Sequence, residues 1–175
     1  MKLYHFTALE YIESILANGL TKGEVVITPR DIRNGVNLTS DPDPAGHGLT
    51  DGGRLTTRER RFMSAEAGAY WPNKRRLRIA VEIADQDAGL QNWLQWSKIN
   101  VDPETRQALI RFGGGIIKAS TWYVHFDTIL PCSFTEIGVR DHSGNYVACR
   151  SSDELHAAIS SLQLPGVRIV ASGKS

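Results

Sequence analysis

The segment RRLRIAVEI, residues 75–83, constrains the fold most strongly, because its apolar and charged side chains alternate. Successive side chains of a β-strand point to opposite faces of a sheet, so this pattern predicts a strand with one apolar and one charged face. The apolar face comprises Leu77, Ile79, Val81 and Ile83, and the charged face comprises Arg76, Arg78 and Glu82. The chain is therefore expected to build a sheet that contains this strand.

Residues 2–20 predict a strand that runs directly into a helix. The strand is expected over residues 3–6, and Thr7 and Glu10 have the spacing of a capping box at the helix start. Asn18-Gly19 is typical of a left-handed helix end. The apolar stripe of the helix consists of Leu9, Ile12, Ile15 and Leu16.

Further short elements follow along the chain. Strands are expected at 24–28, 35–39, 121–130 and 167–170. Helices are expected at 56–69, at 88–96, from Asp102-Pro103 to Gly113, and after Ser151, where Glu154 has capping-box spacing. Residues 29–34 and 40–53 are expected to be loops, and a hairpin is expected around 141–144. This mixture of short strands and helices indicates an α+β fold.

The composition limits the class of protein. With 175 residues, 41% of them hydrophobic, the chain suits one packed domain. It has no basic and apolar leader, and no apolar run approaches the roughly 18 residues of a membrane span, so we expect a soluble, cytoplasmic protein with no membrane partner. Cys132 and Cys149 lack metal-ligand spacing and are expected to be buried free thiols.

Two polar clusters are candidate binding sites. His5 lies at a strand end, between two aromatic residues and close to a helix N-terminus, where polar groups and free amides can surround an anion. A second cluster, in the stretch NLTSDPDPAGHG, contains Thr39, Ser40, Asp41, Asp43 and His47. Both have ordinary structural explanations as well, since histidines are often partly buried and Asp, Ser and Pro form turns.

A basic segment extends from Arg54 to Arg78. It carries eight Lys or Arg residues and two Glu residues, a net charge of +6 in a chain of net charge +1, so the remainder sums to −5. Such a segment favours DNA or RNA as a partner, although a solvated charged face is the common alternative. The candidate nucleic-acid contacts are Arg58, Arg61, Lys74, Arg75, Arg76 and Arg78.

Several chemistries lack their sequence motifs. The glycines of 113–115 are followed by IIK, which does not complete a phosphate-binding loop. The histidines and cysteines have no zinc spacing, so no metal is expected, and no Gly-x-Ser-x-Gly elbow is present.

Three stretches carry a resemblance to a known family: YHFT (4–7), ILANGL (15–20) and GVNLTSDPD (35–43). Together they resemble the ADP-ribosyltransferase-like superfamily, in particular the branch of DNA ADP-ribosyltransferase toxins and RNA 2′-phosphotransferases. The resemblance covers about residues 1–131 and implies a split β-sandwich with short helices. Residues 132–175 would then form a C-terminal β-β-α-β extension packed on the same domain.

The resemblance implies transfer of ADP-ribose from NAD to a nucleic acid or a protein, in a toxin or phage-defence setting. His5 would orient the ribose, and Thr39 and Ser40 would line the nicotinamide side. The residues implied to contact NAD are His5, Phe6, Thr7, Thr39, Ser40, Asp41 and His47.

The glutamate of this superfamily is expected near Thr121 or Trp122, and neither residue supplies a carboxylate to stabilise an oxocarbenium-like ribose. Asp127 or Glu136 could substitute with a shifted geometry, and His125 could act as a general acid or base. The candidate catalytic residues are His5, Ser40, His125 and Glu136. Two alternatives stay open: a non-catalytic module that binds a nucleotide or nucleic acid as an inhibitor or sensor, and a 2′-phosphotransferase-like enzyme.

Overall fold

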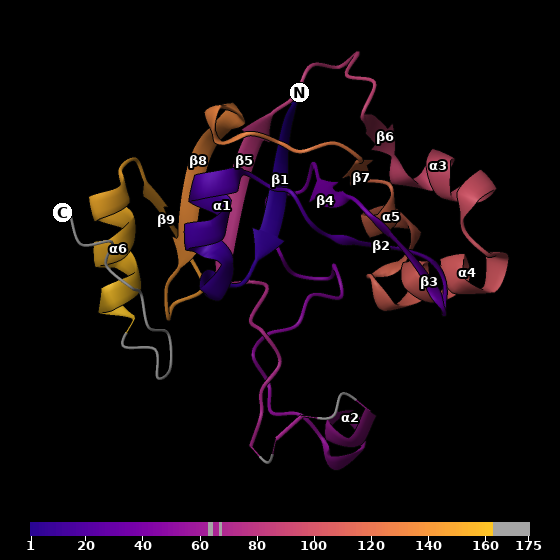
Figure 1. Ribbon diagram of the computed structural model, residues 1–175, viewed down its shortest axis with the longest axis horizontal. Coiled ribbons are helices and arrows are strands. Elements are labelled where there is room, and N and C mark those ends of the chain that lie inside the picture. Colours follow the sequence, from indigo (N-terminus) through magenta and orange to yellow (C-terminus); the bar gives the residue numbers. More distant parts are fainter. Residues whose placement is uncertain (63–64, 67, 163–175) are drawn as a thin grey trace.

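A seven-stranded antiparallel sheet forms the centre of the structure, a computed structural model that describes residues 1–62, 65–66 and 68–162 (Figure 1). The strand order is β6-β7-β4-β1-β5-β8-β9. The strands are β1 Lys2–Thr7, β4 Val36–Thr39, β5 Leu77–Glu82, β6 Leu90–Asn92, β7 Trp122–His125, β8 Phe134–Arg140 and β9 Tyr146–Cys149. A separate small sheet pairs β2 (Glu24–Thr28) with β3 (Asp31–Asn34).

Short helices surround the main sheet, and the predicted α+β class is confirmed. The helices are α1 Ile12–Asn18, α2 Thr57–Phe62, α3 Trp93–Asn100, α4 Pro103–Phe112, α5 Gly115–Ala119 and α6 Ser152–Ser161. Two 3₁₀ turns, Leu9–Tyr11 and Pro131–Ser133, precede α1 and β8. No helix among the described residues is long and apolar enough to cross a membrane.

One face of the sheet is buried beneath α1 and α6. Leu77, Ile79 and Val81 of β5 are fully buried there, which confirms the alternation predicted for residues 75–83. They pack in one apolar core with Leu3 of β1 and with the inward side chains of the two helices. This core stabilises the central strands of the sheet.

The opposite face of the sheet is covered only in part. Helices α3, α4 and α5 gather at its β6–β7 end (Figure 1), where Trp93 and Val124 belong to a second apolar core. Tyr4 of β1, Arg78 of β5 and Glu136 of β8 alternate with core residues and therefore leave their strands on this same face. Because the helices stop short of these strands, a site can form at the boundary.

A long hairpin, residues 49–76, projects from the sheet and carries α2 at its tip (Figure 1). We call it the basic arm. The outgoing and returning segments of the arm are joined by β-bridges between Asp51 and Asn73 and between Arg54 and Tyr70. The predicted helix at 56–69 is therefore wrong in length, since only Thr57–Phe62 is helical; residues 63–64 and 67 lie outside the described residues. The helix begins where the side chains of Thr56 and Glu59 bond each other's backbone amides.

The predicted capping box at Thr7 and Glu10 is wrong. Thr7 pairs with Leu77 and still belongs to β1, so the helical segment begins after Ala8, with a 3₁₀ turn and no side-chain cap. The predicted stop at Gly19 is confirmed, with φ of 80°. A Cβ atom there would lie 2.3 Å from the carbonyl oxygen of Ile129, so the position requires glycine for space as well as for conformation.

Three other predictions of local structure are corrected. Residues 31–34, expected in a loop, form β3, because they pair with β2. Leu90–Asn92, expected in a helix, form β6, and α3 begins after them because the Asn92 side chain caps Gln95. The strand expected at 121–130 ends at His125. The helix starts at Asp102 and Ser151 are confirmed by their side-chain caps.

Residues 134–149 continue the main sheet. β8 pairs with β5, and β9 pairs with β8, so this part adds two strands and α6 to one edge. The strand expected at 167–170 lies outside the described residues. Cys149 is buried as expected, whereas Cys132 is exposed in a 3₁₀ turn, and neither is in a disulfide.

Candidate functional site

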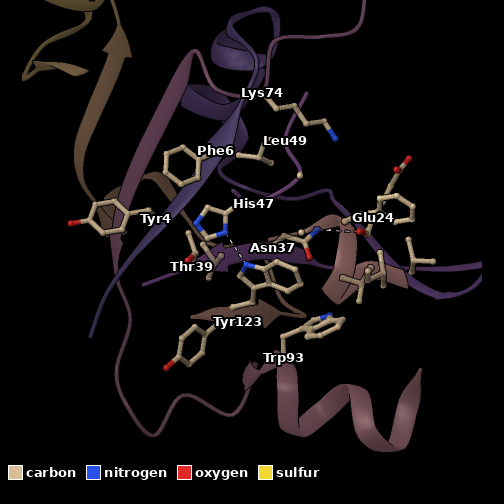
Figure 2. A pocket seen from close by; sticks show the side chains of 18 residues that line it. Tyr4, Phe6, Glu24, Asn37, Thr39, His47, Leu49, Lys74, Trp93 and Tyr123 are labelled. Carbon is tan, nitrogen blue, oxygen red and sulfur yellow. Dashed lines mark hydrogen bonds between the residues drawn. The ribbon is translucent and has the colours of Figure 1, made fainter. Parts of the chain in front are cut away.

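A cavity of about 350 Å³ lies on the partly covered face of the sheet, between β1, β4 and helices α3 and α4. We call it the Trp122 cavity. Its aromatic walls are formed by Tyr4, Phe6, Trp93, Phe112 and Trp122. Its polar lining comes from Glu24, Asn37, Thr39, His47 and Lys74. Figure 2 shows Phe6, Thr39 and His47 grouped around one side of the cavity and Trp93 on another, with Lys74 at the rim.

His47 is the best-defined polar group of the cavity. Its Nδ1 accepts a hydrogen bond of 2.8 Å from the indole Nε1 of Trp122. An indole N–H can only donate, so the proton of a neutral His47 ring must sit on Nε2, which lies 3.5 Å from Oδ2 of Asp41. Burial and the positive charge of Lys118 hold the pKa of His47 below its usual value. The ring is therefore neutral at pH 7.

Asp41 anchors the loop that carries His47. Burial acts to raise the pKa of Asp41, but hydrogen bonds from Lys118 and from the Asp43 amide outweigh it and keep the pKa below its usual value. The Lys118 ammonium lies 2.5 Å from Oδ2, and the Asp43 amide lies 2.9 Å from Oδ1. Asp41 thus acts as a charged anchor behind the cavity wall.

The hydroxyl of Thr39 is engaged on two sides. It accepts a hydrogen bond of 3.0 Å from the Asp41 amide and lies 2.8 Å from the hydroxyl of Thr121, which donates to the Lys118 carbonyl. Thr121 and Trp122 are the two positions where the family resemblance expects a glutamate. Thr121 therefore lies beside the cavity, next to Thr39, and the Trp122 indole forms part of the cavity wall.

The glycine triplet 113–115 allows close packing at one wall of the cavity. A Cβ atom on Gly113 would lie 2.1 Å from the Trp122 ring, and one on Gly114 would lie 2.0 Å from the carbonyl oxygen of Gly46. Gly114 also has φ of 90°, a conformation that side chains other than hydrogen disfavour. The triplet lets the end of α4 press against the indole and against the loop that carries His47.

The residues expected to contact NAD are divided between two faces of the sheet. Phe6, Thr39 and His47 line the Trp122 cavity, and Asp41 supports it. The remaining three, His5, Thr7 and Ser40, do not line it. Ser40 is exposed after β4, and its amide donates to the Thr121 carbonyl.

His5 alternates with Tyr4 and Phe6 along β1, so it leaves the strand on the face opposite to the cavity. Its Nδ1 lies 2.9 Å from the carbonyl oxygen of Asn37, across the gap between β1 and β4. Burial lowers the pKa of His5, and the charge of Lys74 adds to this effect. His5 is therefore a neutral residue, bound to a backbone carbonyl, on the face of the sheet opposite to the cavity.

The four candidate catalytic residues do not converge. His125 shares the buried face with His5, and its ring nitrogens lie 3.2 Å from Asp87 and 2.9 Å from the Asp127 carbonyl. Glu136 lies on the cavity face, but it is two strands from β1 and forms an ion pair of 2.6 Å with Arg78. The structure gives His125 a role in holding the turn before β6 and leaves Ser40 on a loop.

The candidate nucleic-acid contacts occupy four places. Arg58 and Arg61 are exposed on α2 at the arm tip, whereas Lys74 lies at the rim of the Trp122 cavity, at the arm base. Arg75 and Arg76 line a second cavity at the base, described below. Arg78 lies on β5 over the ring of Tyr146, at 4.4 Å from its centroid. These residues therefore do not form one continuous face.

Sequence reasoning missed several cavity residues. Trp93, Trp122 and Phe112 come from three different elements, and Glu24 comes from the small sheet. The alternation along β1 could have shown that Tyr4 and Phe6, and not His5, share a face. No signal in the sequence brings α3 and α4 to that face.

In comparisons with models of protein families, with characterised proteins and with solved structures, the chain has no match. Among the described residues, no group of three or more His, Cys, Asp or Glu side chains is placed to hold a metal ion. The functional proposal therefore depends on the cavity and on the resemblance in sequence.

Proposed function

We propose that the protein binds NAD or a related nucleotide in the Trp122 cavity, as a member of the ADP-ribosyltransferase-like class. The observation that carries the proposal is the combination of Phe6, Trp93 and Trp122 in the walls with Lys74 at the rim. Flat aromatic walls suit a base or a nicotinamide ring, and an ammonium group suits a phosphate. The cavity thus has the two chemistries that a nucleotide requires.

The size of the cavity supports a particular arrangement. Its volume of about 350 Å³ is near the lower end of the ~300–1,000 Å³ found for small-molecule sites. One nucleoside half of NAD would occupy the cavity, with the phosphates directed to Lys74. The other half would extend along the uncovered part of the face, past Tyr4 towards Arg78.

The strand arrangement also supports the split sandwich that the class implies. β1 pairs with β5 at six positions but with β4 only at Tyr4 and Thr39, so the sheet opens between β1 and β4. The small β2–β3 sheet contacts β4 on the cavity side, and Glu24 and Val25 of β2 line the cavity. A nucleotide in this position would lie where the two halves of the sheet separate.

In its enzymatic form, the proposal is transfer of ADP-ribose. The bond between ribose C1′ and the nicotinamide nitrogen breaks, its electron pair leaves with neutral nicotinamide, and an acceptor nucleophile forms a bond to C1′ and loses a proton. Glu24 is the acidic side chain in the cavity lining, and it would stabilise the positive charge on the ribose. Lys74 would hold the pyrophosphate.

A specific observation favours a non-catalytic nucleotide-binding module as the second candidate. Thr121 and Trp122 stand where the resemblance expects a carboxylate, and the Trp122 indole contacts His47 and packs closely on Gly113. A fixed aromatic wall binds a ring but does not stabilise a cationic ribose as a carboxylate does. In this form the protein would bind the nucleotide and release no nicotinamide.

Isothermal titration with NAD, ADP-ribose and nicotinamide tests the binding proposal. The wild type is expected to bind NAD and ADP-ribose, and Lys74→Gln is expected to weaken both about ten-fold, because one charged hydrogen bond to phosphate is lost. Nicotinamide lacks phosphate, so its affinity should not change. Lys98→Gln, an exposed lysine of α3 outside the cavity, is the matched control. No heat with any of the three ligands would contradict the proposal.

Release of nicotinamide from NAD separates the two forms of the proposal. Under the enzymatic form, the wild type releases nicotinamide, and Glu24→Gln slows release with little change in NAD affinity. Glu82→Gln, which removes an exposed carboxylate of β5 outside the cavity, is the control. Binding of NAD without release assigns the non-catalytic form.

A further inference from the structure

A second cavity, of about 320 Å³, lies where the base of the basic arm meets the turn between β8 and β9. We call it the arginine cavity. Three arginines line it: Arg75 and Arg76 from the arm base and Arg140 from the end of β8. The rest of its lining is polar and consists of Asp51, Asn73, Asp141, His142, Ser143 and Gly144.

Each of the three guanidinium groups is held in place by a backbone carbonyl. Arg75 donates from Nε to the Leu49 oxygen at 2.9 Å, and Arg76 donates from Nη1 to the Arg140 oxygen at 3.1 Å. Arg140 donates from Nε to the Gly144 oxygen at 2.9 Å. Each guanidinium group has five N–H donors, and among the described residues each uses one of them in a hydrogen bond. Each arginine is therefore held at one donor and keeps others for a ligand.

The two carboxylates of this cavity, Asp51 and Asp141, offset only two of the three arginine charges. Within the part of the chain that the structure describes, Arg75, Arg76 and Arg140 form no ion pair. Asp51 and Asp141 instead use one carboxylate oxygen each to cap the amides of Gly53 and Asn145 within their own turns. The cavity therefore keeps an excess of positive charge.

We propose that the arginine cavity is a binding site for a phosphate group. A carboxylate has two oxygens and satisfies one guanidinium fork, whereas a phosphate presents enough oxygens to accept from several forks at once. Three fixed forks around a small polar cavity therefore match phosphate better than they match an acidic side chain. The backbone of a nucleic acid and a free phosphate ester share this chemistry, and the experiment below distinguishes them.

The arginine cavity is separate from the Trp122 cavity but adjoins it. Along the arm base, Asn73 and Arg75 line the arginine cavity, whereas Lys74 between them lines the Trp122 cavity. Neighbouring residues of the arm base therefore line two different cavities. The proposal does not depend on what the Trp122 cavity binds.

Substitutions at Ser143 test the site without removing any of its contacts. Ser143 is exposed and lines the cavity, so Ser143→Glu adds one negative charge and Ser143→Gln adds a neutral side chain of the same shape. Binding of inorganic phosphate is measured by the NMR shifts of the amides at 142–144. Binding of a labelled single-stranded oligonucleotide is measured by fluorescence anisotropy at ~50 and ~200 mM salt.

Ser143→Glu is expected to weaken binding at least ten-fold relative to Ser143→Gln. If this difference is found with the oligonucleotide, the phosphate comes from a nucleic-acid strand. If it is found with inorganic phosphate alone, the ligand is a free phosphate compound. Equal affinity of the two variants for both probes, or no binding of either probe by the wild type, would overturn the proposal.

Arg140→Gln provides a second variant with a matched control. It should reduce binding of the same probe about ten-fold, while Arg150→Gln, which removes an exposed arginine that lines neither cavity, should leave binding unchanged. Urea unfolding of both variants checks that the β8–β9 turn still folds. Binding of NAD is measured in parallel, because loss of phosphate binding with unchanged NAD affinity would separate this site from the Trp122 cavity.

Discussion

At the scale of single residues, His47 shows how a buried neighbour fixes a protonation state. Protonating Nδ1 would set two N–H groups against each other, because Trp122 also donates at that position. The native state therefore favours the neutral ring, in agreement with the lowered pKa of His47. This preference contributes to stability, and the contribution depends on pH.

The stability of the wild type should fall on acidification because of this residue. The pKa of His47 is lower in the folded than in the unfolded protein, so the unfolded state binds more protons below pH ~6.5. The contribution is fully present above that value and is lost as the pH falls through the folded pKa, with a limiting slope of about 1.4 kcal/mol per pH unit.

Urea unfolding between pH ~7 and ~5 measures this slope. His47→Gln should show a shallower dependence than the wild type, although not a flat one, because the pKa of His5 is lowered as well. An unchanged slope in the variant would contradict the lowered pKa of His47.

The candidate site was predictable from the sequence for some residues only. The polar loop identified His47 and Asp41, since Asp, Pro and Gly mark a turn that holds side chains in place. His5 was predicted to bind the ligand because of its position at a strand end. The alternation of side chains along β1 instead directs Tyr4 and Phe6 to the cavity face and His5 to the other face. The Trp93 and Trp122 walls depend on contacts between distant elements, which residue spacing does not encode.

At the scale of elements, the glycine triplet is the junction that positions the cavity wall. Gly113 has φ of −90°, which any residue can adopt, so its requirement for glycine is steric alone. Gly115 has φ of 87°, but a Cβ atom there would meet nothing within 4 Å. Substitution of Gly113 therefore tests steric crowding alone, and substitution of Gly115 tests backbone conformation alone.

Gly113→Ala should destabilise the protein by about 1–3 kcal/mol, because the added methyl group displaces the Trp122 ring. Gly115→Ala is the control and should cost about 1 kcal/mol through its left-handed backbone. Urea unfolding gives both values, and tryptophan fluorescence should change in the first variant alone. A smaller loss for Gly113→Ala than for Gly115→Ala would contradict the close contact.

Element boundaries were predicted well where a single side chain determines them. Asp102, Ser151 and Gly19 each act locally, through one cap or one backbone conformation, and each prediction is confirmed. Thr7 was predicted to cap a helix, and residues 90–92 were predicted to lie within one. In both cases pairing with a neighbouring strand outweighed the local preference.

At the scale of the whole molecule, the basic arm is an appendage of the sheet. The β-bridges of the arm join its outgoing and returning segments to each other, and the buried strands of the main core lie outside the arm. The hydrogen bond from the Lys74 amide to the Thr50 carbonyl closes the arm near its base. The outer part should therefore be removable without loss of the fold.

Replacing residues 54–70 by Asn-Gly, a dipeptide that suits a tight hairpin, tests this expectation. The free energy of unfolding should change by less than about 1 kcal/mol, because the two main cores are untouched. The truncated protein should keep the Trp122 cavity and the arginine cavity. A loss of cooperative unfolding would show that the arm belongs to the core.

The class of the fold was predictable, whereas the strand order was not. Alternation and helical spacing identify elements, and the mixture indicates α+β. The order β6-β7-β4-β1-β5-β8-β9 depends on pairings between residues far apart in the chain, such as Thr39 with Trp122. Short strands of three to seven residues leave several orders compatible with the same pattern.

The hydrogen bond from Arg75 to the Leu49 carbonyl joins the walls of the two cavities, since Leu49 lines one and Arg75 lines the other. An anion that attracts the Arg75 guanidinium group away from the Leu49 carbonyl would therefore change the position of Leu49. By thermodynamic linkage, the factor by which a ligand in the arginine cavity changes affinity in the Trp122 cavity must equal the factor in the reverse direction. The arm base is thus a point at which occupancy of one site can be communicated to the other.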